Sequence, residues 1–181
     1  MVYVFLTKGL EPIEAVTPID MLRRAGVDVT TVSLSDSLLV DGAHGITVKA
    51  DKMFADADFA DAEMLILPGG PGSPDMINHS GLCSLLRSFA SAGGRISAIC
   101  AAPSVLGRLG ILDGRKATVY PGCGDGLENI VFTGRSVEHD GNIITAIGPA
   151  ASSAFAAEII ETLRGRDVCE QICSAMQFGV K

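Results

Sequence analysis

Short apolar runs alternate with helical patterns along almost the whole chain, and this alternation constrains the fold more than any other feature. The run VYVFL is followed by a helical pattern over residues 12–26 and then by the β-branched run VDVTTVSL. Strands that alternate with helices pair in parallel, with right-handed crossover helices on both faces of the sheet. The sequence therefore predicts an α/β fold built on a parallel sheet.

The remaining elements continue this pattern. Further strands are predicted in HGITVKADKMF, EMLILPGG, RISAIC and KATVY, and two more on either side of the Asp140-Gly141 turn in RSVEHDGNIITAI. Further helices are predicted in GLCSLLRSFASAGG, PSVLGRLG, PAASSAFAAEIIETLRG and DVCEQICSAM. No repeat, linker or low-complexity tract interrupts the series, so a single domain over residues 1–181 is expected.

Composition excludes several classes of protein. Of the 181 residues, 48% are hydrophobic and 19% charged, which is typical of a folded domain rather than a disordered one. No membrane span and no signal-peptide pattern is evident, and the formal charge of −7 argues against a nucleic-acid-binding groove. Five cysteines without a CxxC motif indicate reduced thiols in a cytoplasmic protein, and three scattered histidines indicate no metal site.

Three loops are expected to meet at one edge of the sheet. Residues 7–11, residues 68–72 and the loop at Cys100 each follow a predicted strand, and ligands of open parallel sheets bind at the carboxyl ends of strands. The glycines of LPGGPGSPD allow backbone N–H groups to point at a ligand, as an oxyanion hole requires. No Lys-Ser/Thr pair follows them, so a phosphate-binding P-loop is disfavoured; a plain tight loop is the alternative.

Cys100 stands where the strand RISAI gives way to Ala101, Ala102 and Pro103. Pro103 suits the first turn of a helix, which places the thiol on a sharp, exposed turn near helical N–H groups. This setting favours the reactive thiolate and parallels the nucleophile elbow of hydrolases. The alternative is an inert, buried cysteine.

Glu14 lies in the first turn of the predicted first helix. On a helical wheel it points away from an apolar stripe made of Ala15, Val16, Ile19 and Leu22, so a surface acid favoured by the helix dipole is one interpretation. Pro18 has no N–H for the Glu14 carbonyl and is expected to interrupt the helix here. An irregularity beside an acid is a hint of function.

Taken together, VFLTKGLEPIEAVTPIDMLRRAG, LILPGG, AICAAPSVLG, VYPG and VEHDGNIITAIGPAASSAFAAEIIETLRG resemble the ThiJ/PfpI superfamily over nearly the whole chain. The nearest branch holds the YajL-like proteins and a deglycase associated with Parkinson disease. The resemblance implies a flavodoxin-like three-layer sandwich with a mostly parallel central sheet. It also implies a homodimer to which the first helix contributes, with Met21, Arg24 and Ala25 on the Glu14 side of that helix.

The resemblance further implies which residues form the site. Cys100 would be the nucleophile, Glu14 the acid that shares a proton with its sulfur, and the N–H groups of Gly70 and Ala101 the oxyanion pocket. No cofactor or metal is implied. Other pocket residues would be Gly69, Tyr120, Pro121, Gly148 and Pro149.

Two departures from the superfamily pattern matter. Tyr120-Pro121 stands where many members have a His-Pro dipeptide, and the common GPGT motif appears as Gly148-Pro149-Ala150-Ala151. No other histidine is expected near Cys100. A cysteine peptidase that uses a Cys-His pair is therefore disfavoured.

The leading functional hypothesis is a glyoxalase or deglycase that acts without a cofactor on reactive dicarbonyls (methylglyoxal, glyoxal) or on their early protein adducts. The alternative is an oxidative-stress sensor or chaperone that acts through oxidation of Cys100. Among the other cysteines, Cys83, Cys169 and Cys173 are expected to pack in helices, the last two against the sheet. Cys123 follows a strand end and is a candidate resolving thiol for Cys100.

Overall fold

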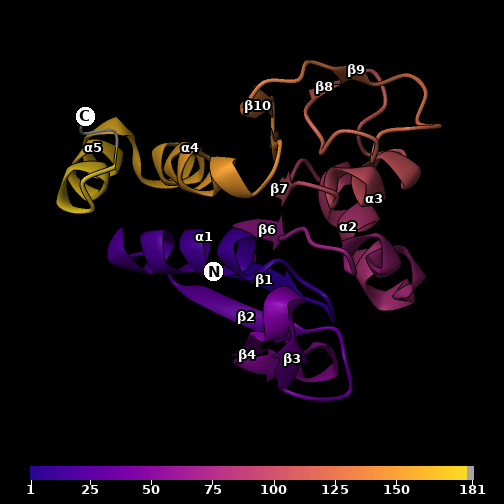
Figure 1. Cartoon of the computed structure of the whole chain (residues 1–181), viewed down its shortest axis with the longest axis horizontal. Coiled ribbons are helices and arrows are strands. Elements are labelled where there is room, and N and C mark those ends of the chain that lie inside the picture. Colours follow the sequence, from indigo (N-terminus) through magenta and orange to yellow (C-terminus); the bar gives the residue numbers. More distant parts are fainter. Residues whose placement is uncertain (179–181) are drawn as a thin grey trace.

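A seven-stranded sheet runs through the molecule between two layers of helices (Figure 1). The computed structural model describes residues 1–178. The strand order is β10-β11-β7-β6-β1-β2-β5, and all neighbours pair in parallel except β10 and β11, which form the predicted hairpin. The strands are β1 (Val2–Leu6), β2 (Val29–Ser33), β5 (Lys52–Met53), β6 (Met64–Leu67), β7 (Arg95–Ile99), β10 (Val137–Asp140) and β11 (Ile143–Ala146). The predicted α/β sandwich with a mostly parallel sheet is confirmed.

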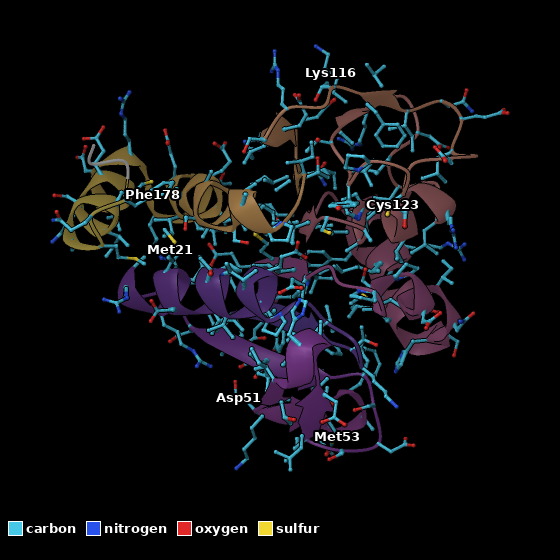
Figure 2. All side chains as sticks on the ribbon, viewed as in Figure 1. Met21, Asp51, Met53, Lys116, Cys123 and Phe178 are labelled. Atoms are coloured by element: carbon cyan, nitrogen blue, oxygen red, sulfur yellow. The ribbon has the colours of Figure 1, made fainter. Side chains whose placement is uncertain are left out.

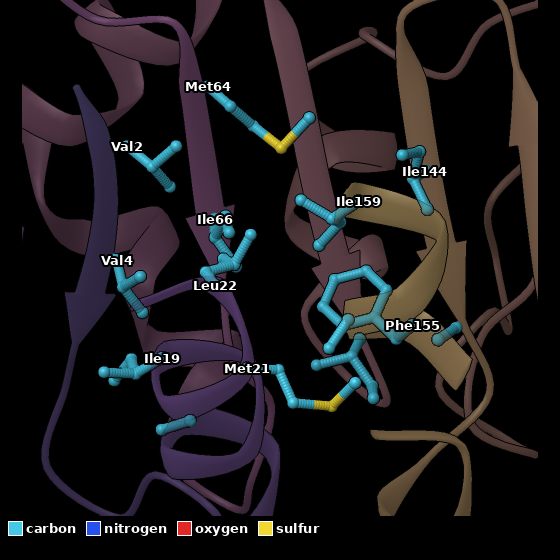
Figure 3. Packing of buried hydrophobic residues seen from close by; sticks show 14 of the residues in the cluster. Val2, Val4, Ile19, Met21, Leu22, Met64, Ile66, Ile144, Phe155 and Ile159 are labelled. Atoms are coloured by element: carbon cyan, nitrogen blue, oxygen red, sulfur yellow. The ribbon is translucent and has the colours of Figure 1, made fainter. Parts of the chain in front are cut away.

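Alternating side chains of the buried strands feed two separate cores. In β1, Val2, Val4 and Leu6 face one core, and Tyr3 and Phe5 face the other, because successive side chains of a strand point to opposite faces. The helices of the first core are α1 (Pro12–Arg24), α4 (Ser152–Arg164) and α5 (Arg166–Ala175); those of the second are α2 (Ser80–Ser91) and α3 (Pro103–Arg108). Figure 3 shows the first core, where side chains of α1 and α4 meet those of the strands.

The topology opens a crevice beside β1. The chain proceeds from β1 to β2 on one side, whereas β6, which comes later, pairs on the other side of β1. Loops that leave β1 and β6 therefore diverge over opposite halves of the sheet, and such a switch point is where open α/β sheets bind ligands. The positions of these strands thus select the edge at which a site can form.

Two small sheets lie outside the central one. The strands β3 (Leu39–Asp41) and β4 (Thr47–Lys49) form an antiparallel hairpin with the short 3-10 turn η1 (Ala43–Gly45) at its tip. The segment KATVY forms only β8 (Lys116–Ala117), which pairs with β9 (Val131–Phe132) and not with the central sheet. Further 3-10 turns are η2 (Phe54–Asp56), η3 (Ser73–Asn78) and η4 (Pro149–Ala151).

The first helix differs from its prediction in two ways. It is continuous from Pro12 to Arg24 with Pro18 inside it, so the predicted interruption is wrong. Packing of the helix between the sheet and α4 outweighs one missing backbone hydrogen bond. The helical wheel is also wrong for two residues: Val16, assigned to the apolar stripe, is 47% exposed, whereas Glu14, assigned to the side away from it, has no exposed surface.

Met21 is buried as well. Its side chain extends from α1 towards α4 (Figure 2), beside Phe155 (Figure 3), so it belongs to the core of the chain itself. Helix α1 is thus covered on two sides, by the sheet and by α4, which is why a single apolar stripe does not describe it.

The last helix packs on another helix rather than on the sheet. The Cys169 thiol donates to the Ala157 carbonyl of α4 at 3.3 Å, and the Cys173 sulfur lies 3.9 Å from the Cys169 sulfur. The prediction that both cysteines pack against the sheet is therefore wrong. Within residues 1–178, no helix combines the length and hydropathy needed to cross a bilayer.

Candidate active site

The three predicted loops converge on one cavity of about 360 Å³ at the carboxyl ends of the strands. The loop after β1 and the start of α1 contribute Glu11 and Glu14, the loop after β6 contributes Gly70, and the turn after β7 contributes Cys100 and Ala101. A volume of this size is at the lower end of the range for small-molecule sites. The cavity therefore fits a small substrate, or one side-chain adduct of a larger one.

Cys100 occupies a strained turn between β7 and α3. Its φ is 64°, in the left-handed region that side chains other than glycine rarely adopt. The conformation is held on both sides of the residue, because the Cys100 N–H donates to the Ala146 carbonyl at 2.8 Å and the Cys100 carbonyl accepts from the Tyr120 N–H at 2.8 Å. The sharp turn was predicted, but the predicted exposure was not found: Cys100 is only 8% exposed and lies in the wall of the cavity.

Glu14 enters the cavity from the first turn of α1. Its carboxyl group is fully buried, and neither oxygen makes a hydrogen bond of regular geometry with the described residues. The Cys100 thiol and the Gly69 N–H are nevertheless its polar neighbours. A Cβ built on Gly69 would collide with Glu14 Oε2 and would come within 2.6 Å of the Cys100 Cβ, so all three residues meet at one point.

The electrostatics of this pair favour the protonated forms. Burial raises the pKa of Glu14 from 4.5 to about 7, and the charge of Glu11 adds to the increase. Burial also raises the pKa of the Cys100 thiol from 9.0 to about 12, with the negative charge of Glu14 as the second cause. The predicted shift of Cys100 towards thiolate is therefore wrong in direction, because burial and the facing acid outweigh the nearby N–H groups.

Two backbone N–H groups point at the Cys100 sulfur. The N–H groups of Gly70 and Ala101 both act to lower the pKa of the thiol, which is the effect of donors directed at a negative charge. Gly70 has φ 112°, and a Cβ there would collide with backbone atoms of Glu11 and lie 2.5 Å from the Gly9 carbonyl oxygen. The position thus admits only glycine, and both donors are the ones that the resemblance to the superfamily implies.

The predicted wall residues divide into two groups. Tyr120 and Pro149 line the cavity, whereas Gly148 does not: a Cβ on Gly148 would lie 3.2 Å from the Tyr120 ring, so Gly148 packs against that ring. Pro121 instead lines a neighbouring hollow, because the chain turns outward after Tyr120, and its prediction as a pocket residue is wrong.

Three more polar side chains line the cavity, those of Glu11, His44 and Cys123, so the expectation that no histidine lies near Cys100 is wrong. His44, from the tip of the β3–β4 hairpin, makes a contact of 3.1 Å between its Nε2 and Glu11 Oε2. Cys123, on the loop between β8 and β9 (Figure 2), also lines the cavity, as its prediction as a resolving thiol requires. No local pattern in the sequence marks Glu11 or His44, because hairpin and loop meet only in the folded chain.

The other two histidines lie elsewhere. The His79 Nδ1 accepts from the Leu82 N–H at the start of α2, and His139 contacts Glu158 at 2.7 Å on the outer hairpin. Within the part of the chain that the structure describes, no three His, Cys, Asp or Glu side chains cluster as metal ligands would.

The chain belongs to the DJ-1/PfpI family, whose model matches residues 1–162. Among similar proteins, dj-1beta of Drosophila melanogaster is 35% identical over 96% of this chain and 94% of that protein. The Parkinson disease protein 7 homolog of Danio rerio is 33% identical over 93% of this chain and 92% of that protein. Deglycase PH1704 of Pyrococcus horikoshii is 30% identical over 91% of this chain and 100% of that protein.

Other relatives are longer than this chain. DJ-1 homolog A of Arabidopsis thaliana is 36% identical over 94% of this chain, but this match spans only 45% of that protein, and homolog B is matched over 38% of its length. Among solved structures, Drosophila DJ-1beta superposes with a TM-score of 0.93 at 35% identity, covering 97% of this chain and 96% of that one. Oxidized Toxoplasma gondii DJ-1 gives 0.92 at 31%, covering 98% of each chain.

Proposed function

We propose that this chain is a glyoxalase or deglycase that needs no cofactor and acts on small reactive dicarbonyls, or on their early adducts with proteins. The observation that carries the proposal is the contact between a buried thiol and a buried carboxyl group, Cys100 and Glu14, in a cavity with two N–H groups directed at the sulfur. A relative named as a deglycase, at 30% identity over its whole length, supports this class of reaction. We place the activity in the cytosol, since all five cysteines are free.

The chemistry begins with the thiol. Since the pKa of Cys100 is about 12, the sulfur needs a base at the moment it attacks, and Glu14 is the adjacent base. A pKa of about 7 suits this role, because a general base is most effective when its pKa lies near the working pH. As the sulfur bonds to the aldehyde carbon, Glu14 takes the thiol proton, and the N–H groups of Gly70 and Ala101 stabilise negative charge at the reacting centre.

The second step moves hydrogen within the substrate. Glu14 returns the thiol proton to the oxygen of the attacked carbon, which completes a hemithioacetal and leaves Glu14 as a base again. Glu14 then moves the hydrogen on the attacked carbon to the neighbouring carbonyl oxygen, which gives an enediol, and moves the hydroxyl proton of the attacked carbon to the neighbouring carbon. The attacked carbon is thereby oxidised to a thioester and its neighbour is reduced to an alcohol, so no external oxidant is required. Water then releases a hydroxy acid, and methylglyoxal gives lactate.

The test is conversion of methylglyoxal to lactate by the purified protein. Cys100→Ser and Glu14→Gln should each lower the rate at least about 10²-fold, the usual effect of losing an acid–base group. Cys83→Ser is the matched control, since that thiol is also buried but bonds to the carbonyls of Met76 and Ile77, outside the cavity. Wild-type turnover in either of the first two variants would remove the proposal.

A second candidate function is sensing of oxidants by the same cysteine. Two equivalents of peroxide convert the thiol to a sulfinate, with release of two waters. The protonated Glu14 carboxyl and the N–H groups of Gly70 and Ala101 can donate to the new oxygens. Mass spectrometry after mild peroxide should find two added oxygens at Cys100; oxidation spread evenly over all five thiols would exclude this role.

We also propose that the chain forms a homodimer through α1. Ile13 and Val16 are exposed apolar residues about one helical turn apart on this helix. Met21, which was expected on this surface, is buried in the core and takes no part.

A further inference from the structure

A second acid and a histidine share the cavity with Cys100 and Glu14, and the reaction proposed above does not yet use them. Glu11 Oε2 and His44 Nε2 lie 3.1 Å apart, and both residues line the cavity. The Glu11 carboxyl group is mostly buried, whereas the His44 side chain is 72% exposed. The cavity therefore holds one acid sealed from solvent, Glu14, and one carboxylate–imidazole pair open to it.

The fold holds this pair at the cavity mouth. The hairpin tip is attached to the loop after β1 by two hydrogen bonds, from the Ala43 N–H to the Leu10 carbonyl at 2.8 Å and from the Gly9 N–H to the Asp41 carbonyl at 2.7 Å. His44 itself has φ 60°, a conformation that residues other than glycine seldom adopt. Strained residues of this kind concentrate at functional sites, where the surrounding structure maintains them.

The last step of the proposed reaction lacks a base. Hydrolysis of the thioester requires a water molecule that loses a proton as it attacks, and this water has to enter from solvent. Glu14 has no exposed surface. His44 has access to water, and imidazole is the most common general base in enzymes. When one ring nitrogen donates to a carboxylate, the other becomes the acceptor, which is the state that a general base needs.

We propose that His44 is the general base for hydrolysis of the Cys100 thioester, and that Glu11 is the positioning residue that orients its ring. This inference rests on the proposed glyoxalase activity. In the step, the water oxygen bonds to the thioester carbonyl carbon, the water proton passes to His44, and the carbon–sulfur bond breaks. The sulfur then recovers a proton, so the free thiol and a hydroxy acid are regenerated.

The experiment is rapid-quench kinetics of methylglyoxal consumption with His44→Gln. The first turnover should proceed at the wild-type rate, because attack and proton transfer use Cys100 and Glu14. Later turnovers should slow about 10²-fold, the typical effect of removing a general base. Intact-protein mass spectrometry should then detect a lactoyl group on Cys100, and added hydroxylamine, which cleaves thioesters without a base, should restore turnover.

Two further variants make the test specific. Glu11→Gln should show the same burst with a smaller loss in the later turnovers, because an unoriented imidazole still accepts protons. His139→Gln is the matched control, since this histidine also contacts a glutamate, Glu158, but lies on the outer hairpin. It should show no burst and unchanged turnover.

The outcomes separate this inference from the function on which it rests. If His44→Gln matches the wild type in both phases, or slows the burst as much as the later turnovers, the role of His44 is overturned and the glyoxalase proposal stands. If the wild-type protein fails to consume methylglyoxal, both are overturned.

Discussion

Replacing Glu14 with glutamine should make the stability of the protein less dependent on pH. Glu14 is buried with a pKa of about 7, whereas its ordinary value is 4.5, so between these two values the folded state binds a proton that the unfolded state has released. The stability contributed by this proton is fully present below pH 4.5 and is lost as the pH rises through 7. At about 1.4 kcal/mol for each pKa unit, the loss amounts to about 3 kcal/mol.

Glutamine has nearly the same shape and does not titrate, so Glu14→Gln removes this loss. The difference in free energy of unfolding between variant and wild type should therefore shift in favour of the variant, by about 3 kcal/mol between pH 4.5 and pH 8.5. Urea unfolding followed by circular dichroism at several pH values measures it, and the subtraction cancels the titration of groups that do not interact with Glu14.

Glu128 is exposed and provides the control, because Glu128→Gln also replaces a glutamate but at a position that the fold does not bury. A Glu14→Gln difference no more dependent on pH than that of Glu128→Gln would refute the reasoning, because it would mean that the Glu14 carboxyl is not desolvated by the fold. The same result would remove the physical basis for Glu14 as a base near neutral pH.

Two other substitutions test the packing of the site and the proposed dimer. Gly69→Ala places a Cβ against Glu14 and 2.6 Å from the Cys100 Cβ. Methylglyoxal turnover should fall at least about 10²-fold, because Glu14 and Cys100 are then misplaced. Gly26→Ala is the control and should stay active: φ is +68° there, but nothing lies within 4 Å of the added Cβ. Val16→Asp should convert the proposed dimer to a monomer in analytical ultracentrifugation. Val131→Asp, at an exposed site on β9, should leave the dimer intact. A wild-type protein that sediments as a monomer would contradict the proposal of a dimer.

Much of the fold followed from patterns that are local in the chain. The run Val2–Leu6 is a strand with both faces buried, and its neighbours in the sheet follow the predicted alternation with helices. The turn at Cys100 was also predictable, because small residues and a proline after an apolar strand leave few conformations open. The segment KATVY is the exception: its local β-propensity is real, but its position outside the central sheet depends on pairing with residues 131–132.

The sequence alone determined which elements form and which thiol stands at the end of a strand, because hydrophobic periodicity and turn chemistry act over a few neighbouring residues. Tertiary structure decided the charge state of that thiol, since burial and the facing Glu14 carboxyl raise its pKa against the effect of the local N–H groups. It also decided that His44 joins the cavity, 33 residues along the chain from its partner Glu11. Desolvation and contacts between distant segments exist only once the chain has folded. No local pattern can therefore encode the direction of the Cys100 pKa shift or the position of His44 in the cavity.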